Sequence, residues 1–174
     1  ITILLPLSKY CLDMSIERVE VLKFGGTSVG GVEAFHQSCS VIEGHLEEGK
    51  GLVVVVSAMA GVTDKLHRAW DLALSGDRAG SNGLIDGIKQ QHVDVLNQLA
   101  GGADVGQLES KITGVTAEVL NVLGAVSIFL SGSSSVKDKV VSAGERMSSY
   151  LLGAALQSMG KPAVVVDAAE VMKT

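Results

Sequence analysis

Short apolar runs alternate along this chain with longer segments of helical periodicity, and this alternation is what most limits how the chain can fold. The runs lie at residues 19–24, 52–56 and 163–166, and valine dominates them. The second run is apolar without interruption, which is typical of a strand in a parallel sheet covered by helices. Strands that alternate with helices therefore predict an α/β fold with a mainly parallel sheet.

The segments between the runs predict helices, because their apolar residues recur at steps of three and four. Helices are expected over residues 31–48, from 62 to a glycine-containing turn at 76–83, over 84–100, through 108–129 and over 136–159. The third and fourth of these predict a helical hairpin at about residues 83–131, packed along an internal apolar seam. A coiled-coil partner surface is the alternative use of that seam. An irregularity is expected at Gly144 in the last helix.

The composition predicts a globular core and argues against a nucleic-acid partner. Hydrophobic residues make up 47% of the 174 residues, but aromatic residues only 3%, so the core must be built mainly from aliphatic side chains. The net charge of -5 and the scarcity of aromatic side chains argue against a surface that binds nucleic acid. The length suits one domain or a large part of one.

Neither the cysteines nor the histidines have the spacing of a metal site. Cys11 and Cys39 are the only cysteines, which excludes a cysteine zinc site and a disulfide framework and predicts a reducing, cytoplasmic compartment. The histidines fall in helical patterns without metal-binding spacing, so no metal site is expected. They are His36, His45, His67 and His92.

Residues 1–14 are predicted to be a disordered or non-native extension ahead of a domain over residues 15–174. The apolar stretch at residues 3–7 is too short to span a bilayer, and no other segment suggests a membrane partner. No basic region precedes it, so a secretory signal is not expected.

Two consecutive glycines follow the first apolar run, in the stretch KFGGTS at residues 23–28. A strand, a glycine turn and a helix together present backbone N–H groups to an anion, and glycine lets phosphate oxygens approach closely. Lys23 would add a positive charge there. The alternative is a plain turn beside a solvated lysine. The G-x-x-x-x-G-K sequence at residues 44–50 is not a P-loop, because Gly51 follows it and it precedes a strand.

Polar residues follow all three apolar runs at the positions where the strands should end. They are Lys23, Ser57 and Asp167. Ligands of open parallel sheets bind at the carboxyl ends of the strands. These polar groups are therefore expected to converge on one edge of the sheet.

Three stretches together resemble aspartate kinases of the amino acid kinase superfamily: KFGGTSV at residues 23–29, VSAMAGVTD at 56–64 and SAGERMSS at 142–149. The resemblance covers the chain from about Val19 to its end. It implies the family's three-layer α/β/α sandwich, of which this chain would be the amino-terminal portion. It also implies transfer of the γ-phosphoryl group of ATP, with Mg²⁺, to the β-carboxylate of L-aspartate. The product would be 4-phospho-L-aspartate, at the first step of lysine, threonine and methionine biosynthesis.

The resemblance assigns roles within these stretches. Lys23 is the catalytic residue, which offsets charge that develops on the transferring phosphoryl group. The residues implied to bind ATP and its phosphates are Lys23, Phe24, Gly25, Gly26, Thr27 and Ser28. Those implied to bind aspartate are Ser57, Thr63 and Glu145, the last through the ammonium group of aspartate.

Each role has an alternative. The hydroxyl residues in the first two stretches could instead cap helices. Glu145 could instead pair within the chain with Arg146 or a lysine, although adjacent helical residues point about 100° apart. Asp167 is given no role.

Other members of the superfamily act on glutamate, acetylglutamate or carbamate, and a non-catalytic domain of the same fold could bind a metabolite. The family's second half, which carries most nucleotide contacts, is absent from this sequence, so the chain alone is expected to be inactive. The full-length protein is expected to be a homo-oligomer, and a fusion with homoserine dehydrogenase is left open.

Overall fold

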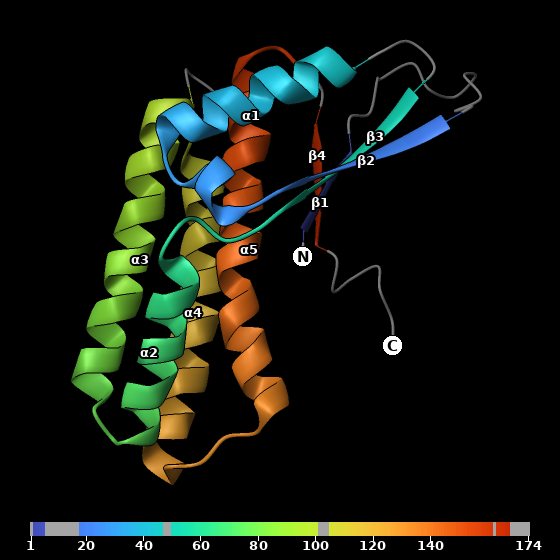
Figure 1. The fold of residues 1–174 in the computed structure, drawn as a ribbon. Helices are drawn as coiled ribbons and strands as arrows, with labels where there is room; N and C mark the ends of the chain where they lie inside the picture. The colour runs from blue at the N-terminus through green and yellow to red at the C-terminus, as the bar shows by residue number, and fades with distance from the viewer. Residues whose placement is uncertain (1, 6–17, 47–49, 101–104, 162, 168–174) are drawn as a thin grey trace.

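The computed structural model describes residues 2–5, 18–46, 50–100, 105–161 and 163–167. Figure 1 shows its strands and helices. In chain order these are β1 (Thr2–Leu5), β2 (Arg18–Phe24), the short 3-10 helix η1 (Gly26–Val29), α1 (Val32–His45), β3 (Lys50–Val56), α2 (Val62–Leu74), α3 (Arg78–Leu99), α4 (Val105–Phe129), α5 (Ser134–Ser158) and β4 (Val164–Asp167).

The strands form one sheet in the order β2–β3–β1–β4, and it is mixed where the sequence predicts a mainly parallel sheet. β2 and β3 are parallel, with Phe24 opposite Val56. β1 is antiparallel to both of its neighbours, so Thr2 lies opposite Val56 on one side and Asp167 on the other. β3 and β4 therefore point the same way, and their carboxyl ends reach the same edge of the sheet.

The strand β1 corrects the expectation of a disordered extension for residues 2–5. Its backbone fills the place between β3 and β4 and pairs with both. A strand in that position satisfies the N–H and C=O groups that two neighbouring strands would otherwise leave unpaired. Residues 6–14 lie outside the described residues, and so does Gly49, where the sequence predicts a helix end.

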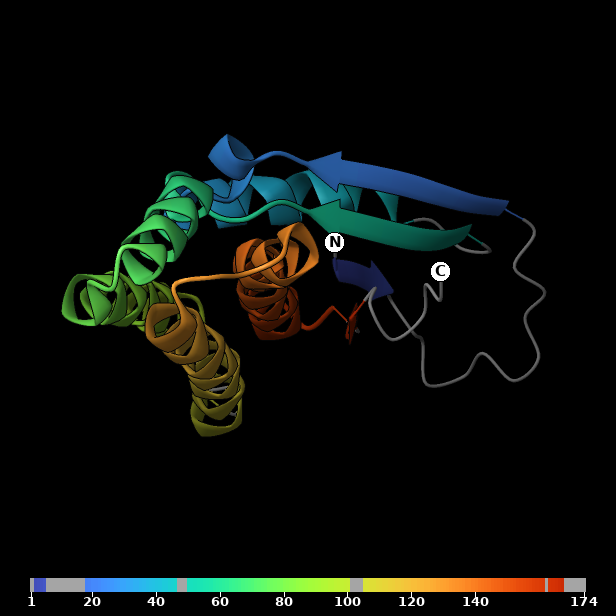
Figure 2. The same ribbon diagram turned by 90° about the horizontal axis from the view of Figure 1, so that it is seen from below.

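The side chains of β2 and β3 alternate between a covered and an open face of the sheet. Leu52, Val54 and Val56 of β3 are at most 2% exposed and belong to the same core as the buried residues of α1 and α5. On the opposite face of β2, Val19 and Val21 are 58% and 63% exposed. Figure 2 shows helices on one side of these strands only. The described residues thus make two of the three layers that the resemblance implies.

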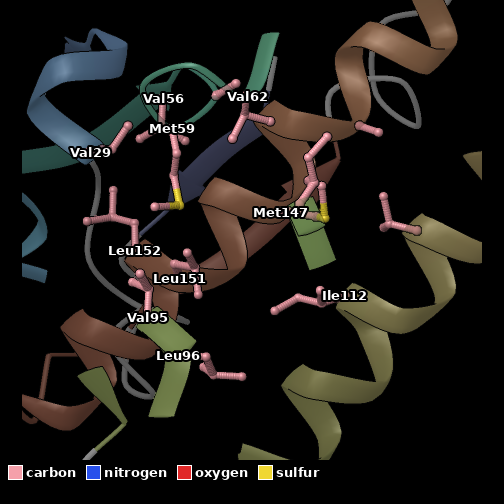
Figure 3. Packing of buried hydrophobic residues seen from close by; sticks show 14 of the residues in the cluster. Val29, Val56, Met59, Val62, Val95, Leu96, Ile112, Met147, Leu151 and Leu152 are labelled. Atoms are coloured by element: carbon pink, nitrogen blue, oxygen red, sulfur yellow. The ribbon is translucent and has the colours of Figure 1, made fainter. Parts of the chain in front are cut away.

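Helices α2, α3, α4 and α5 pack into a bundle that extends away from the sheet (Figure 1). Met147, Leu151 and Leu152 of α5 are at most 1% exposed. Figure 3 shows these side chains between Met59, near the end of the sheet, and Ile112 of α4. A helix that is apolar around most of its circumference is typical of the centre of a core. α5 therefore connects the bundle to the sheet.

The predicted helical hairpin is formed by α3 and α4, but α3 begins earlier than expected. The Asp77 carboxylate accepts a hydrogen bond from the Gly80 N–H (2.9 Å) and caps the helix. The Ser81 hydroxyl donates to the Ala69 carbonyl of α2 (2.9 Å) and is buried. The prediction of a turn through residue 83 is wrong, because this cap and this contact outweigh the low helix propensity of glycine.

The apolar seam of α4 is buried along most of its length but not at its end. Ile112, Val115, Val119 and Val126 are buried, whereas Phe129 is 75% exposed. Among the described helices, α4 alone is long and apolar enough to cross a membrane by length and composition, and 39% of its most apolar window is buried within the structure. Its buried side chains pack against α2, α3 and α5.

Trp70 of α2, the chain's only tryptophan, packs against the α4–α5 loop, which lies at the end of the bundle far from the sheet (Figure 1). Trp70 is 3% exposed, and a Cβ at Gly132 would overlap its ring, so only glycine lets the α4–α5 loop lie against the indole. The Ser133 hydroxyl accepts a hydrogen bond from the Val136 N–H (3.3 Å). The serine loop therefore caps α5, as the sequence predicts.

His92 of α3 is a fully buried titratable group in the bundle. Its Nδ1 lies 2.7 Å from the Ile88 carbonyl, and among the described residues its Nε2 has no hydrogen-bond partner. Burial lowers the pKa of His92 below its usual value of 6.5, and the charge of Lys65 lowers it further. The neutral imidazole, with Nδ1–H donating to the carbonyl, fits these surroundings.

The chain should therefore lose stability as the pH falls below about 6.5, where the unfolded histidine gains a proton and the folded one resists it. The loss should approach about 1.4 kcal/mol per pH unit until the folded-state pKa is reached. Urea unfolding between pH 5 and 7.5 measures it. His92→Leu should flatten this slope, whereas His67→Gln, at an exposed position on α2, should leave it unchanged. An equal slope in His92→Leu would contradict the prediction.

Candidate active site

The segment after β2 makes a tight turn. Gly25 is the N-cap of η1, and its carbonyl accepts a hydrogen bond from the Ser28 N–H (3.0 Å). Thr27 is exposed and Ser28 half-buried. The Ser28 carbonyl accepts from the Ser38 hydroxyl (2.6 Å), which ties the turn to α1. This single 3-10 turn separates the two glycines from α1, which begins at Val32, next to the helix start at residue 31 that the sequence predicts.

Lys23 and Ser57 lie on the same, open face of the sheet. Lys23 is exposed and stands opposite Val55. The Ser57 N–H donates to the Phe24 carbonyl (3.0 Å), so the pairing of the two strands continues one residue past β3. Because side chains alternate along strands, those of Lys23, Val55 and Ser57 project to one side. The ammonium and the hydroxyl therefore stand near the same corner of the sheet.

The loop between β3 and α2, residues 57–61, passes very close to the glycine turn. A Cβ on Gly26 would lie 2.9 Å from the Ala58 carbonyl oxygen, a contact that a side chain could not make without moving the backbone. Gly61 has φ of 76°, in the left-handed region that glycine adopts without strain, and it is the N-cap of α2. Two glycines thus let the first and second signature stretches pack backbone against backbone.

The third stretch reaches the same loop from α5. A Cβ on Gly144 would lie 2.8 Å from the Ala58 Cβ and 3.0 Å from the Val62 Cγ1. α5 runs without a break through this position, so the predicted irregularity at Gly144 is wrong. The glycine instead allows α5 to approach the β3–α2 loop closely. Glu145, the next residue, is half-buried.

The β3–α2 loop therefore lies between η1 on one side and α5 on the other. Thr63 is exposed in the first turn of α2. The backbone N–H groups of a helix's first turn have no hydrogen-bond acceptor within the helix. A helix N-terminus favours negatively charged groups. The fold thus gathers three segments that are distant in sequence around one helix N-terminus at the carboxyl edge of the sheet.

The hydroxyl groups of these stretches are not used as helix caps. The N-caps of η1, α1 and α2 are Gly25, Gly31 and Gly61, and none of them makes a side-chain capping hydrogen bond. Glycine fills the places that the capping alternative would give to serine or threonine. This leaves the hydroxyl groups of Thr27 and Thr63 exposed to solvent.

Arg146 carries the most prominent ion-pair cluster near the site. Its Nη1 donates a hydrogen bond to Glu118 Oε2 of α4 (2.8 Å), and its Nε lies 2.9 Å from Asp167 Oδ2 at the end of β4. The Nε–H is not aligned for a hydrogen bond, so this second contact is an ion pair. Burial acts to lower the pKa of Arg146, but the hydrogen bond and the charges of Glu118 and Asp167 outweigh it and raise the pKa.

This cluster was not predicted from the sequence. The sequence marks Asp167 only as a polar residue at a strand end, and no pattern connects Glu118 with it. Arg146 forms ion pairs with Glu118 of α4 and Asp167 of β4, two carboxylates that are distant from it in the sequence.

Two concave sites lie beside α5. One, of about 310 Å³, is bounded by Glu118, Lys139, Ser142, Arg146 and Asp167. The other, of about 260 Å³, lies among α4, α5 and β4 and includes Lys111 and Tyr150. None of the side chains that the resemblance assigns to ATP or aspartate lines either of these two sites. No group of three His, Cys, Asp or Glu side chains within the described ranges could hold a metal ion.

Comparison with protein families matches residues 18–173 to the model of the amino acid kinase family. The chain belongs to the amino acid kinase family. The α/β fold expected for that family is borne out by the solved structures it resembles. Aspartokinase III of E. coli with aspartate and ADP has a TM-score of 0.67 and 27% identity, over 83% of this chain and 30% of that one. The same enzyme with lysine and aspartate has a TM-score of 0.68.

Curated relatives of this amino acid kinase chain are also named aspartokinase or aspartate kinase. It is 31% identical over 152 residues to the chloroplastic bifunctional aspartokinase/homoserine dehydrogenase 1 of Zea mays, which covers 87% of this chain and 16% of that protein. It is 52% identical over 46 residues to the aspartate kinase of Pseudomonas putida, over 26% of this chain and 11% of that one. The matched segments thus cover less than a third of the length of each of these relatives.

Proposed function

We propose that this chain supplies the amino-terminal part of an aspartate kinase site. The enzyme would transfer the γ-phosphoryl group of ATP to the β-carboxylate of L-aspartate and release ADP and 4-phospho-L-aspartate. The observation that carries the proposal is the meeting of the three signature stretches at the β3–α2 loop, through Gly26 and Gly144. The names of the relatives, and a solved relative that holds aspartate and ADP, support the choice of acceptor and nucleotide.

In this proposal the nucleotide, as its Mg²⁺ complex, places its phosphates against the turn after β2. The N–H groups of Gly25 and Gly26 face the phosphate oxygens, and the hydroxyl groups of Thr27 and Ser28 add donors. The Phe24 carbonyl is already bonded to Ser57, so Phe24 contributes by fixing the turn to β3.

A carboxylate oxygen of aspartate attacks the γ-phosphorus, and the bond from that phosphorus to the bridging oxygen of ADP breaks. Negative charge shifts onto the equatorial and leaving oxygens during this step. The Lys23 ammonium, at the end of β2, offsets that charge. The chain's contribution to the rate is thus positioning and charge neutralisation, with no covalent intermediate on the protein.

Aspartate itself would lie at the N-terminus of α2. Ser57 and Thr63 provide hydroxyl donors for its carboxylates, and no capping bond holds either hydroxyl at the start of α2. Glu145, half-buried on α5, would bind the ammonium group.

A cytoplasmic location and a homo-oligomeric full-length protein are part of the proposal. The buried Cys39, whose thiol pKa burial raises to about 11, would be unreactive in a reducing compartment.

The test is an acceptor panel on the full-length polypeptide that carries this chain. Acyl phosphates formed from ATP are trapped with hydroxylamine, with aspartate, glutamate, acetylglutamate and carbamate as acceptors. Aspartate should give the highest kcat/KM by at least about 100-fold, which corresponds to about 2.7 kcal/mol of transition-state discrimination. If another acceptor gives the highest kcat/KM, that acceptor replaces aspartate in this proposal. If none of the acceptors yields an acyl phosphate, the kinase proposal fails and the chain belongs to a metabolite-binding domain of the same fold.

A further inference from the structure

Arg146 joins three elements at the carboxyl edge of the sheet, and we propose that it is the positioning residue for Glu145. This inference rests on the proposed function, because it concerns the carboxylate that would bind the ammonium group of the substrate. Arg146 itself touches Glu118 of α4 and Asp167 of β4, so its role would be exercised through the placement of α5.

The two contacts of Arg146 are short and partly shielded from solvent. The side chain of Arg146 is 28% exposed and that of Asp167 21%. Glu118 is 64% exposed, so its bond is the more hydrated of the two. Thr2 of β1 pairs with Asp167 of β4 on one side and with Val56 of β3 on the other, so these three residues lie side by side across the sheet. The Arg146–Asp167 pair therefore ties α5 to the edge of the sheet where β3 also ends.

Gly144, Glu145 and Arg146 are consecutive on a helix and so point about 100° apart. Gly144 faces the β3–α2 loop, where α5 packs against Ala58 and Val62. Arg146 faces β4. Glu145 lies between these two directions, so the close contact on one side and the ion pair on the other together fix the roll of α5 about its axis. A change in that roll would turn the Glu145 carboxylate away from the site.

An arginine suits this position better than a lysine. The guanidinium presents separate N–H donors in a rigid fork, so Nη1 and Nε reach two carboxylates on different elements at once. A single ammonium group would keep the charge but could not hold both contacts in this geometry. The cavity of about 310 Å³ beside Arg146 leaves room for a shorter, hydrated side chain, so Arg146→Lys should fold.

The experiment uses the full-length polypeptide that carries this chain, with steady-state kinetics in which ATP and the acceptor are varied separately. Arg146→Lys should raise KM for aspartate at least fivefold, with kcat and KM for ATP within twofold of wild type. Asp167→Asn should shift KM in the same direction. The double variant should raise KM for aspartate no more than the stronger single variant does, because both substitutions break the same contact between Arg146 and Asp167. Arg68→Lys, at an exposed position on α2, is the matched control and should change nothing.

An unchanged KM for aspartate in Arg146→Lys would overturn the inference, as would a loss of kcat alone, which indicates a smaller folded fraction. Amide hydrogen exchange of residues 142–149 gives a readout that does not need turnover. Exchange there should be faster in Arg146→Lys than in wild type or Arg68→Lys, and equal exchange would also overturn the inference. If wild type phosphorylates no acceptor, the proposed function fails while the exchange comparison still decides whether Arg146 holds α5.

Discussion

Lys23→Ala is expected to lower kcat for aspartyl phosphate formation by about 100- to 1,000-fold in the full-length polypeptide. The reason is that phosphoryl transfer depends on neutralising charge on the transferring group, and removal of one well-placed electrostatic contact costs about 100- to 1,000-fold in comparable sites. Lys23 is exposed at the end of β2, so its loss should leave the free energy of unfolding within about 0.5 kcal/mol of wild type. Hydroxylamine trapping at saturating ATP and aspartate measures the rate.

The matched control for this substitution is Lys137→Ala. Lys137 lies at the start of α5, with its Nζ 3.7 Å from Oδ1 of the exposed Asp71, and ion pairs at the surface contribute little to stability. Its kcat should equal that of wild type. If Lys23→Ala retained more than a tenth of the wild-type rate, Lys23 would be a solvated surface lysine, as the plain-turn alternative holds.

Gly144→Val is expected to destabilise the protein by about 3 kcal/mol. The substitution adds three carbon atoms between α5 and the β3–α2 loop, where there is no room even for a Cβ. The first of these atoms, the Cβ, would lie 2.8 Å from the Ala58 Cβ and 3.3 Å from the Leu66 Cδ1. α5 would have to move away from the β3–α2 loop, and Glu145 would move with it. Urea unfolding should show the loss of stability, and kinetics should show a higher KM for aspartate.

Gly114→Val tests whether the effect comes from packing or from the helix itself. Gly114 is exposed in the middle of α4, and a Cβ there would meet nothing within 4 Å. Valine has a helix propensity no worse than that of glycine, so this variant should change stability by less than about 0.5 kcal/mol. If Gly114→Val and Gly144→Val lost equal amounts of stability, the close packing at Gly144 would not be the cause of the destabilisation.

Local signals in the sequence predicted the main elements correctly where one pattern dominated. The unbroken apolar run at residues 52–56 became β3, and the face of α2 that carries Val62, Leu66 and Ala69 is buried as its spacing predicts. Glycine was the residue most often misread. Gly80 lies inside α3 and Gly144 inside α5, because tertiary contacts and caps at neighbouring positions override its low propensity.

The remaining features depend on contacts between residues far apart in sequence. The pairing of Arg146 with Glu118 and Asp167 joins a helix hairpin to a strand end, and no periodicity in one segment reports on it. The strand β1 exists because of its two neighbours and carries no turn or strand signal strong enough to distinguish it from an extension. The candidate site residues came from a resemblance, and the structure adds the reason why their segments meet.

The burial of Trp70 has a practical consequence for measurement. Because the chain contains one tryptophan, packed against Gly132 of the α4–α5 loop, its tryptophan fluorescence has a single origin. Emission would therefore shift to longer wavelength when the α4–α5 loop separates from α2. Nucleotide or amino acid binding near the β3–α2 loop, at the opposite end of the bundle, should leave that signal unchanged.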